Sequence, residues 1–585
     1  MAYIVKRKNR EGKEYVYLIE SFREDGKGKK RTLKSYGSYE ELERNEPGAY
    51  ERLRKEAKEG LLTDEIGRKL SVTYELDSPL YDEDLSYGWK LLDDVFEMLR
   101  IGDAIKENSK DKKKALVYER VLKLLVYQRI LNPGSKIYTA RSQKELFGSW
   151  DLSSNDIYRS LEPLSQLKEA IQLRAHEEIS KNIGRLGYLV FYDVTNYYFD
   201  IDFNDEDLVD KTTGEISSGL RKKGPCKSNS GSPIVQMGLF MDSNGIPISY
   251  RLFSGNETDP LTYLPAIKQV KRQFGLERVV VVADKAMNSK KNVGANHANK
   301  DGWLFSQKHR GRRGSPKDIQ DFILKEDGWL YNKTMDFAWK SMIRVRALED
   351  GLEVKEKVLV TWNEKYALRE KKRRDGALDY ASKLTNAELF RQTAKRGGKR
   401  YLELFYEDPI TKELRPFSPV IKINEDQLAF DEQFDGINVL VTSELDMSEE
   451  EIMAAYSELY RIEECFRITK TDLHAKPVHL RLKDHIESHF LSCFISLMII
   501  RIIQTLGGDG FDFSAARLAR ALGSAGAHEL NTGFYRVKGN EDFKELVEKL
   551  GIDWNKGIVK YEELRDFSKG WCTTVKSQQI IALGL

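Results

Sequence analysis

Apolar positions along the chain change their spacing several times, and each spacing predicts a different kind of element. Residues 85–184 carry apolar side chains at intervals of three and four, which predicts a series of helices. Residues 187–199 instead form a nearly continuous apolar run, as expected for a strand at the centre of a covered sheet. Two apolar runs flank the turn residues 243–245 and predict a β-hairpin, and residues 277–283 predict another buried strand.

The order of these elements predicts the fold class. Between residues 187 and 305, three strands are followed by helix, strand, helix and strand, which is typical of a mixed sheet with helices on its faces. Residues 308–434 are too many for a loop and contain strand-like pieces, so they predict a β-rich insertion. Residues 436–443 restore an apolar strand, and residues 2–36 predict a small antiparallel sheet. We therefore expect an α/β protein with a helical N-terminal region.

The same patterns divide the chain into parts. We expect a small basic β element (1–40), a helical region (41–184), the first part of the central sheet (185–307), the β-rich insertion (308–434), the second part of the sheet with the helix described next (435–508) and a C-terminal helical region (509–585). The basic β element is a candidate for DNA contact. The helical region, broken at Asn132, Pro133 and Gly134, fits a DNA-binding domain as well as plain helical packing.

The stretch 448–473 predicts one amphipathic helix. Ser448 and Glu451 form a capping box at its start. Tyr456 and the residues seven and fourteen positions later, Glu463 and Lys470, share one face of this helix. The core-facing stripe consists of Ile452, Ala455, Leu459, Ile462 and Phe466. Taken alone, the polar face is more typical of a solvated helix with ordinary ion pairs than of a functional site.

The composition says more about the cellular compartment of the protein than about its binding partners. The 585 residues include 95 Lys or Arg and 92 Asp or Glu, so local basic clusters matter more than the net charge of +3. The 4 cysteines are far apart and form neither a zinc motif nor a disulfide framework, which favours a reducing cytoplasm. The N-terminal segment is too charged for a signal peptide, and the longest apolar run, 490–500, is too short to span a membrane. We expect a cytoplasmic protein with no membrane partner.

Three carboxylates occupy positions from which they can converge. Asp193 lies within the strand at 187–199, Asp284 follows the strand at 277–283, and Glu463 lies on the amphipathic helix. Asp and Glu are rarely buried without a partner or a metal, and strand ends are where α/β sheets place their sites. Convergent carboxylates repel one another unless cations bind them. Two divalent ions about 3.5–4 Å apart, held by such oxygen ligands, are what phosphodiester chemistry uses.

A basic cluster follows the predicted strand at 303–305. Its members are Lys308, Arg310, Arg312 and Arg313. Because Lys and Arg neutralise phosphates, we expect this cluster to follow a nucleic-acid backbone close to the carboxylates. For any one basic cluster, a role in solubility is equally well supported.

The motifs around the carboxylates resemble a known family. FYDVTNYYF surrounds Asp193, VVVADKAMNSKKN surrounds Asp284, and YSELYRIEECFRITK contains Glu463. Over residues 185–505 the chain resembles the DDE transposases of bacterial insertion sequences, in the branch marked by a Tyr-x2-Arg-x3-Glu-x6-Lys helix signature. One position departs from that signature, because Leu459 stands where it has arginine.

The resemblance implies a fold and a chemistry. The fold is an RNase H-like sheet, and the reaction is metal-dependent hydrolysis of one strand at each transposon end, followed by attack of the 3′-hydroxyl on DNA. Many members of this branch release the element through a hairpin intermediate. The resemblance implies two Mg²⁺ ions, with Mn²⁺ as a substitute. Asp193 and Glu463 would hold one ion, and Asp193 and Asp284 the other.

The resemblance also implies DNA contacts. Tyr456 and Lys470 are expected to bind phosphates near the cut, and Arg467 is the candidate for the role of the missing arginine. Trp362 in the insertion is a candidate for stacking on an extruded base, although core packing is the more common role of such a tryptophan. Thr195 could orient the carboxylate of Asp193, but a strand-forming role is the simpler interpretation.

The expected partners are the terminal inverted repeats of the element, target DNA and a second copy of the chain in a synaptic complex. The cell is expected to be bacterial or archaeal, with the protein associated with the nucleoid. Two alternatives remain open. One is a transposase-derived DNA-binding protein that no longer cleaves, and the other is a metal-dependent nuclease that cuts without strand transfer.

Overall fold

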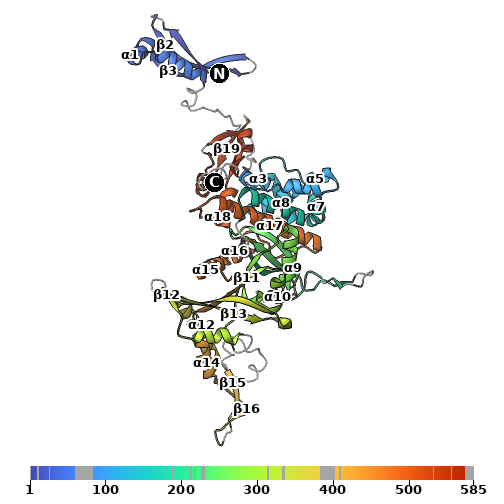
Figure 1. The fold of residues 1–585 in the computed structure, drawn as a ribbon. Coiled ribbons are helices and arrows are strands. Elements are labelled where there is room, and N and C mark those ends of the chain that lie inside the picture. The colour runs from blue at the N-terminus through green and yellow to red at the C-terminus, as the bar shows by residue number, and fades with distance from the viewer. Residues whose placement is uncertain are drawn as a thin grey trace. The chain divides into compact units, whose positions relative to one another are not determined.

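The computed structural model forms two compact units, Met1–Tyr81 with Leu530–Thr532, and Asp82–Glu529 with Gly533–Leu585. We describe each unit by itself (Figure 1). The described residues are all except 1, 10–11, 25–26, 60–83, 186–188, 210–213, 215, 218, 226–230, 312–314, 333–335, 383–401, 408–409, 531–532, 555 and 573–585.

The first unit is a three-stranded antiparallel sheet with two helices, in agreement with the alternating pattern of its sequence. Its elements are β1 (Ala2–Lys8), β2 (Glu14–Glu24), β3 (Lys27–Ser38), α1 (Tyr39–Asn45) and α2 (Ala49–Glu59). A small core centred on Val16, Leu18 and Leu53 joins the sheet to α2. The ammonium of Lys6 lies over the rings of Tyr39 and Tyr50, 3.1 and 4.2 Å from their centroids, where cation–π attraction stabilises the contact.

The second unit begins with a group of helices. They are α3 (Trp89–Met98), α4 (Ile101–Asn108), α5 (Lys112–Leu131), α6 (Lys136–Ser142), α7 (Ser154–Gln166) and α8 (Lys168–Asn182). The long helix α17 (Lys483–Leu506) packs against α7 and α5 (Figure 1). In the described part of the chain, α17 alone is long and apolar enough to cross a membrane, but 94% of its most apolar window is buried inside the protein. It is therefore the central helix of a core.

A nine-stranded mixed sheet forms the middle of the second unit. Its strand order is β12-β13-β14-β17-β11-β10-β5-β8-β9. The bounds are β5 (Leu189–Tyr198), β8 (Ile234–Met241), β9 (Pro247–Ser254), β10 (Val280–Ala283), β11 (Gly302–Ser306), β12 (Leu330–Asn332), β13 (Phe337–Ala347), β14 (Glu353–Asn363) and β17 (Ile437–Thr442). Strands β5, β10 and β11 are parallel and all other neighbours are antiparallel. The chain is thus a mixed α/β protein, as the order of its apolar runs predicts.

Helices cover both faces of this sheet because successive strand residues point to opposite faces. On β5, Phe191 and Tyr197 join the core shared with α17, whereas Tyr192 and Val194 join a second core. That second core also contains side chains of α9 (Asp259–Phe274), α10 (Lys290–Ala298) and α11 (Lys317–Leu324). This burial on both faces explains why the strand has a nearly continuous apolar sequence.

Residues 308–434 contribute to the central sheet. Within this expected insertion, β12, β13 and β14 extend the sheet beyond β17. The rest contains α12 (Glu364–Ser382), a ladder of β15 (Leu402–Glu407) and β16 (Leu414–Ile423), and α14 (Glu425–Glu432). The β17 strand continues the sheet because it pairs with both β14 and β11.

The region 509–585, expected to be helical, contains strands as well. Its elements are α18 (Ala515–Gly523), β18 (Gly526–Leu530), β19 (Phe534–Lys538), α19 (Glu541–Lys549), β20 (Ile558–Lys560) and α20 (Tyr561–Arg565). The strands join β4 (Leu85–Ser86) in a four-stranded sheet, so residues from both ends of the second unit pair with each other. A strand as short as β4 gives no alternating sequence pattern by which it could be predicted. A further short ladder pairs β6 (Leu208–Val209) with β7 (Ile216–Ser217).

Candidate active site

Asp193 lies in the middle of β5, opposite Leu239 on β8. Its side chain is half-buried on the same face as Phe191 and Thr195, and its Oδ1 accepts a hydrogen bond of 2.7 Å from the amide of Val194. This bond within the strand holds the carboxylate close to the backbone.

Asp284 lies directly after β10 and begins the short 3-10 turn Lys285–Met287. Its Oδ1 accepts hydrogen bonds from the amide of Lys285 at 2.6 Å and from the hydroxyl of Ser306 at 3.1 Å. In the parallel pairing of β5 and β10, Phe191 is opposite Val282, which places Asp193 and Asp284 at the same level two residues later. The two carboxylates therefore arise from neighbouring strands at one edge of the sheet.

The side chain of Tyr456 connects these carboxylates with Glu463. Its phenol is mostly buried and hydrogen-bonded to Ser306, and its pKa is raised to about 12, first by burial and then by the negative charges of Asp284, Asp193 and Glu463. All three carboxylates thus lie within electrostatic reach of one hydroxyl group. The structure brings together four of the residues that the sequence singled out.

The stretch that carries Tyr456 and Glu463 differs from the expected single helix. It consists of α15 (Glu449–Ser457), α16 (Tyr460–Arg467) and a π-helical turn, Ile468–Asp472. The predicted capping box at Ser448 is present. Around Leu459 the backbone hydrogen bonds span three residues instead of four, which tightens the turn. The Ser457 hydroxyl donates to the carbonyl of Ala454 over 2.7 Å, a type of bond that disturbs helices. Residue spacing alone did not reveal this break.

Helix α16 is anchored on the hairpin between β8 and β9. Arg461 donates to the carbonyl of Asn244 over 3.3 Å, and the buried Cys465 lies 3.7 Å from the carbonyl of Gly245. From α17, Arg501 forms an ion pair of 2.8 Å with Glu464. With these contacts on its inner side, α16 leaves the Glu463 side chain exposed.

Lys470 reaches back to the strand that carries Asp193. Its ammonium donates to the hydroxyl of Thr195 and lies 5.4 Å from the ring centroid of Tyr197. Thr195 is two residues beyond Asp193 on the same face of β5, so Lys470 is positioned beside the carboxylates. Thr195 therefore contacts a cation in addition to forming the strand.

Sequence reasoning missed Ser306. This residue ends β11, the third parallel strand, and its hydroxyl contacts both Asp284 and Tyr456. A signal was available, because the ends of neighbouring parallel strands meet at the same edge of a sheet. A lone serine after an apolar run is common in sequences, so it can be singled out only when the neighbouring parallel strand is known.

Leu459, which stands where the signature has arginine, and Arg467, the candidate for the role of that arginine, have different surroundings. Leu459 is half-buried and packs against the core shared with α17. Arg467 is exposed, and its guanidinium is 3.7 Å from Glu464 and 3.3 Å from Asp472. Arg467 thus has carboxylate neighbours on its own helix and on the turn that follows.

The remaining predicted DNA contacts have different surroundings. Lys308 is exposed, whereas Arg310 donates to the carboxylate of Glu370 and lies 3.5 Å from Asp435. Arg312 and Arg313 lie outside the described residues. Trp362 lies on β14 opposite Ile437, where it is half-buried and packs against the core on the α9 side of the sheet.

Comparison with known proteins identifies the family. The family model for the N-terminal domain of IS1634 family transposases matches residues 3–63, and the transposase DDE domain matches residues 208–499. The chain belongs to the DDE transposases of insertion sequences. Asp284 and Glu463 lie inside the matched DDE domain of this transposase, and Asp193 lies on the strand just before it.

Two solved transposase structures are similar to this transposase at a low level. One is a piggyBac transposase synaptic complex with hairpin DNA, with 8% identity and a TM-score of 0.33, covering 88% of this chain and 85% of that chain. The other is a pre-cleavage Mos1 transpososome, with 13% identity and a TM-score of 0.14, covering 44% of this chain and 66% of that chain. No curated protein sequence matches this transposase.

Transposase DDE domains generally use divalent metal ions. The donors gathered here are three carboxylates and the hydroxyls of Tyr456 and Ser306, all oxygen, which is the donor type that Mg²⁺ prefers. Within the described ranges, no three His, Cys, Asp or Glu side chains are drawn together closely enough to hold an ion in this conformation. The donor chemistry fits a hard divalent ion, while the carboxylates remain apart.

Proposed function

We propose that this transposase cleaves the ends of its insertion sequence and joins the resulting 3′-hydroxyls to target DNA. The observation that carries the proposal is that Asp193, Asp284 and Glu463 all lie within electrostatic reach of the hydroxyl of Tyr456. The order β9-β8-β5-β10-β11, three antiparallel strands followed by two parallel ones, supports an RNase H-like sheet. Bringing three carboxylates to one point is costly unless cations neutralise them.

Asp193 would hold both of two divalent ions, Mg²⁺ or Mn²⁺, one together with Glu463 and the other together with Asp284. Such a pair of ions supplies activation of the attacking oxygen and stabilisation of the leaving oxygen. Asp193 lies on a strand between β8 and β10, directly beside the strand that leads to Asp284, which suits the shared role. Glu463 is exposed on α16 and can approach the strands from outside the sheet.

The neighbouring side chains orient the DNA strand. Because the pKa of Tyr456 is about 12, its phenol stays protonated at neutral pH and donates a hydrogen bond to a phosphate oxygen. Lys470, positioned by Thr195, adds a positive charge beside the same phosphate. Lys308 and Arg467, both exposed, bind phosphates farther along the backbone. These contacts position DNA and carry no sequence information.

Other predicted contacts extend the same surface. Arg310, Arg312 and Arg313 come shortly after β11 in the chain and Trp362 lies on β14, and we propose that these residues follow the DNA as it leaves the site. Arg310 would exchange its contact with Glu370 for a phosphate. Two copies of the chain would hold the two transposon ends, since both ends must be cut together.

The test is cleavage and joining of a duplex that carries the element's end, with Mg²⁺ or Mn²⁺. Asp193→Asn, Asp284→Asn and Glu463→Gln should each strongly reduce nicking while DNA binding persists. Glu450→Gln, an exposed carboxylate on α15, is the matched control and should cleave normally. DNA binding by the wild type without any cleavage would identify a non-cleaving binding protein. Cleavage without joined products would identify a nuclease.

A further inference from the structure

In the first unit, helices cover only one face of the sheet. Successive residues of β1 and β2 point to opposite faces. Ile4, Val16 and Leu18 point to one face and share a core with Leu53 and Ala57 of α2. The residues between them point away from α2, and no described member of this second set belongs to that core. The second set, named the open face below, consists of Tyr3, Val5, Arg7, Tyr15, Tyr17, Ile19 and Ser21, with Lys30 and Thr32 beside them on β3.

The open face carries cations and no carboxylate. Arg7 and Lys30 are both exposed, and neither forms an ion pair within the described ranges. Glu14 and Glu20 alternate with the open-face residues of β2 and therefore point to the helix side, where Glu20 pairs with Arg31 at 2.6 Å. The glutamates of α1 and α2 also lie on the helix side. The two signs of charge are thus separated between the two faces of this small sheet.

Tyrosine rings lie between the two cations. Arg7 is opposite position 15 of β2 and Lys30 is opposite position 21, which are about 20 Å apart at about 3.3 Å per residue. The guanidinium of Arg7 lies 6.0 Å from the ring centroid of Tyr17, and the ammonium of Lys30 lies 5.8 Å from that of Tyr3. These contacts hold the cations on the open face, at its two ends.

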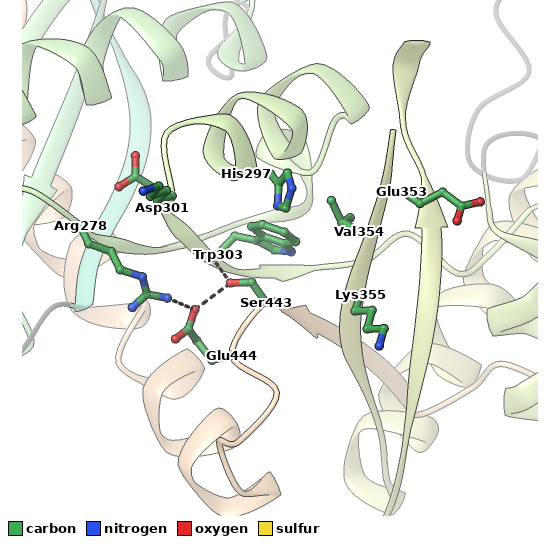
Figure 2. Close-up of a pocket in the computed structure, with 10 residues that line it drawn as sticks. Arg278, His297, Asp301, Trp303, Glu353, Val354, Lys355, Ser443 and Glu444 are labelled. Carbon is green, nitrogen blue, oxygen red and sulfur yellow. Dashed lines mark hydrogen bonds and ion pairs between the residues drawn. The ribbon is translucent and has the colours of Figure 1, made fainter. Parts of the chain in front are cut away.

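A cavity in the second unit has a different charge pattern. Its volume is about 450 Å³. Cations and carboxylates line it together: Arg278, Lys300, Lys355, Asp301, Glu353 and Glu444. Figure 2 shows the guanidinium of Arg278 joined to the carboxylate of Glu444, a contact of 2.6 Å. Because charges of both signs offset one another there, the cavity favours neither anions nor cations, whereas the open face favours a polyanion.

We propose that the open face binds the duplex DNA of the element's end in its major groove, an inference that rests on the proposed function. The major groove is about 12 Å wide and admits a ribbon of two β-strands, here β1 and β2. Arg7 and Lys30, at the two ends of the face, bind phosphates. Tyr15 and Tyr17 lie between them and meet the base edges, where a phenol hydroxyl forms hydrogen bonds and the ring contacts thymine methyl groups.

Binding of the full-length protein to a duplex with the element's end and to an unrelated duplex tests the phosphate contacts. Arg7→Ala/Lys30→Ala should weaken binding of both duplexes roughly 10–100-fold and reduce the salt dependence, the slope of log K against log salt, by about two. Lys55→Ala/Lys58→Ala removes the same charge from exposed positions of α2 and should bind like the wild type. Equal binding by the two double variants would overturn the proposal.

The contacts with bases need a second pair of measurements. Tyr15→Phe/Tyr17→Phe keeps the rings and removes the hydroxyls, so it should weaken binding of the element's end by about tenfold and leave the unrelated duplex unaffected. The wild type should protect guanine N7, an atom of the major groove, from methylation by dimethyl sulfate. Equal losses on both duplexes, unprotected N7 atoms or tighter binding of single-stranded DNA would contradict major-groove binding.

Failure of this inference and failure of the proposed function give different results. Asp193→Asn should bind the element's end like the wild type, because binding at the open face does not depend on the carboxylates. Wild-type binding without cleavage, together with weak binding by Arg7→Ala/Lys30→Ala, contradicts the proposed function alone. Normal binding and cleavage of the element's end by Arg7→Ala/Lys30→Ala contradicts the inference alone.

Discussion

Asp242 and Asp284 each come directly after a strand, yet their surroundings differ. Asp242 follows β8, is 2% exposed, and forms an ion pair of 2.5 Å with Arg185. It also accepts hydrogen bonds from the amides of Asn244 and Ile246 in the hairpin. Asp284 follows β10, is exposed, and makes no ion pair with any other residue in the described ranges.

On the proposed function, this difference separates a structural carboxylate from a candidate metal ligand. A buried carboxylate with an arginine and two amides has all the partners that its fold requires. Asp284 and Glu463, in contrast, have no cationic side chain in the described part of the chain paired with them, and they share their neighbourhood with Asp193. On the proposed function, the cation that Asp284 and Glu463 take is a divalent metal ion.

The largest expected effect is the loss of DNA cleavage when Asp284, which follows β10, is replaced. Asp284→Asn should reduce DNA cleavage on the order of 10³-fold, because a metal ligand that stabilises the transition state by several kcal/mol is lost. The melting temperature of the Asp284→Asn variant should stay close to that of the wild type, since no ion pair is broken. Cleavage gels and calorimetry measure both quantities. A strongly lowered melting temperature with normal cleavage would reverse the roles of Asp284 and Asp242.

The corresponding change at the end of β8 should affect stability instead. Asp242→Asn leaves the guanidinium of Arg185, whose side chain is 7% exposed, buried without its counter-charge. Loss of one partner of a buried ion pair costs about 3–5 kcal/mol. Unfolding in urea measures this loss. The double variant Asp242→Asn/Arg185→Gln should be less destabilised than the single one, and an equal loss in both would contradict the role of the ion pair.

Lys470 is expected to contribute less than the carboxylates. Lys470→Met should lower cleavage roughly 10–100-fold and reduce the dependence of DNA binding on salt, since one phosphate contact is lost. Thr195→Val should give a smaller loss, because the lysine remains but is no longer held. Kinetics of the two single variants and the double variant measure the coupling. Additive losses would show that Thr195 does not position Lys470.

Tyr456 should give the smallest effect and a defined pH dependence. Tyr456→Phe removes one hydrogen-bond donor and should slow cleavage by about tenfold or less. Since the pKa of Tyr456 is raised from about 10 to about 12, the protonated phenol contributes stability that is complete below pH 10 and is lost as pH rises to 12. Thermal unfolding between pH 9 and 12 should therefore be less pH-dependent in Tyr456→Phe. Equal slopes would indicate an ordinary, solvated phenol.

Local patterns predicted the elements that surround these carboxylates. The continuous apolar run around Asp193 is a strand covered on both faces, the turn at residues 243–245 joins β8 to β9, and the capping box at Ser448 begins α15. These features depend on residues within a few positions of one another. Spacing and residue type are sufficient to identify them.

The errors arise where tertiary contacts decide the outcome. The stretch 448–473 has helical spacing throughout, but bonds from Ser457 and Thr469 to carbonyls of the preceding turn accompany its division into two helices and a π-helical turn. The region 509–585 pairs its strands with β4, which is more than four hundred residues earlier in the chain. Periodicity cannot report a hydrogen-bonding partner at that distance.

The sequence by itself determined which side chains are available: the three carboxylates, the tyrosine and the lysine, each on an element whose type its neighbours predict. Only the tertiary structure decided that they gather around Tyr456, that Ser306 joins them, and that Thr195 contacts Lys470. The physical reason is that element type follows from local spacing, whereas contact between distant residues follows from which strands pair and in which register.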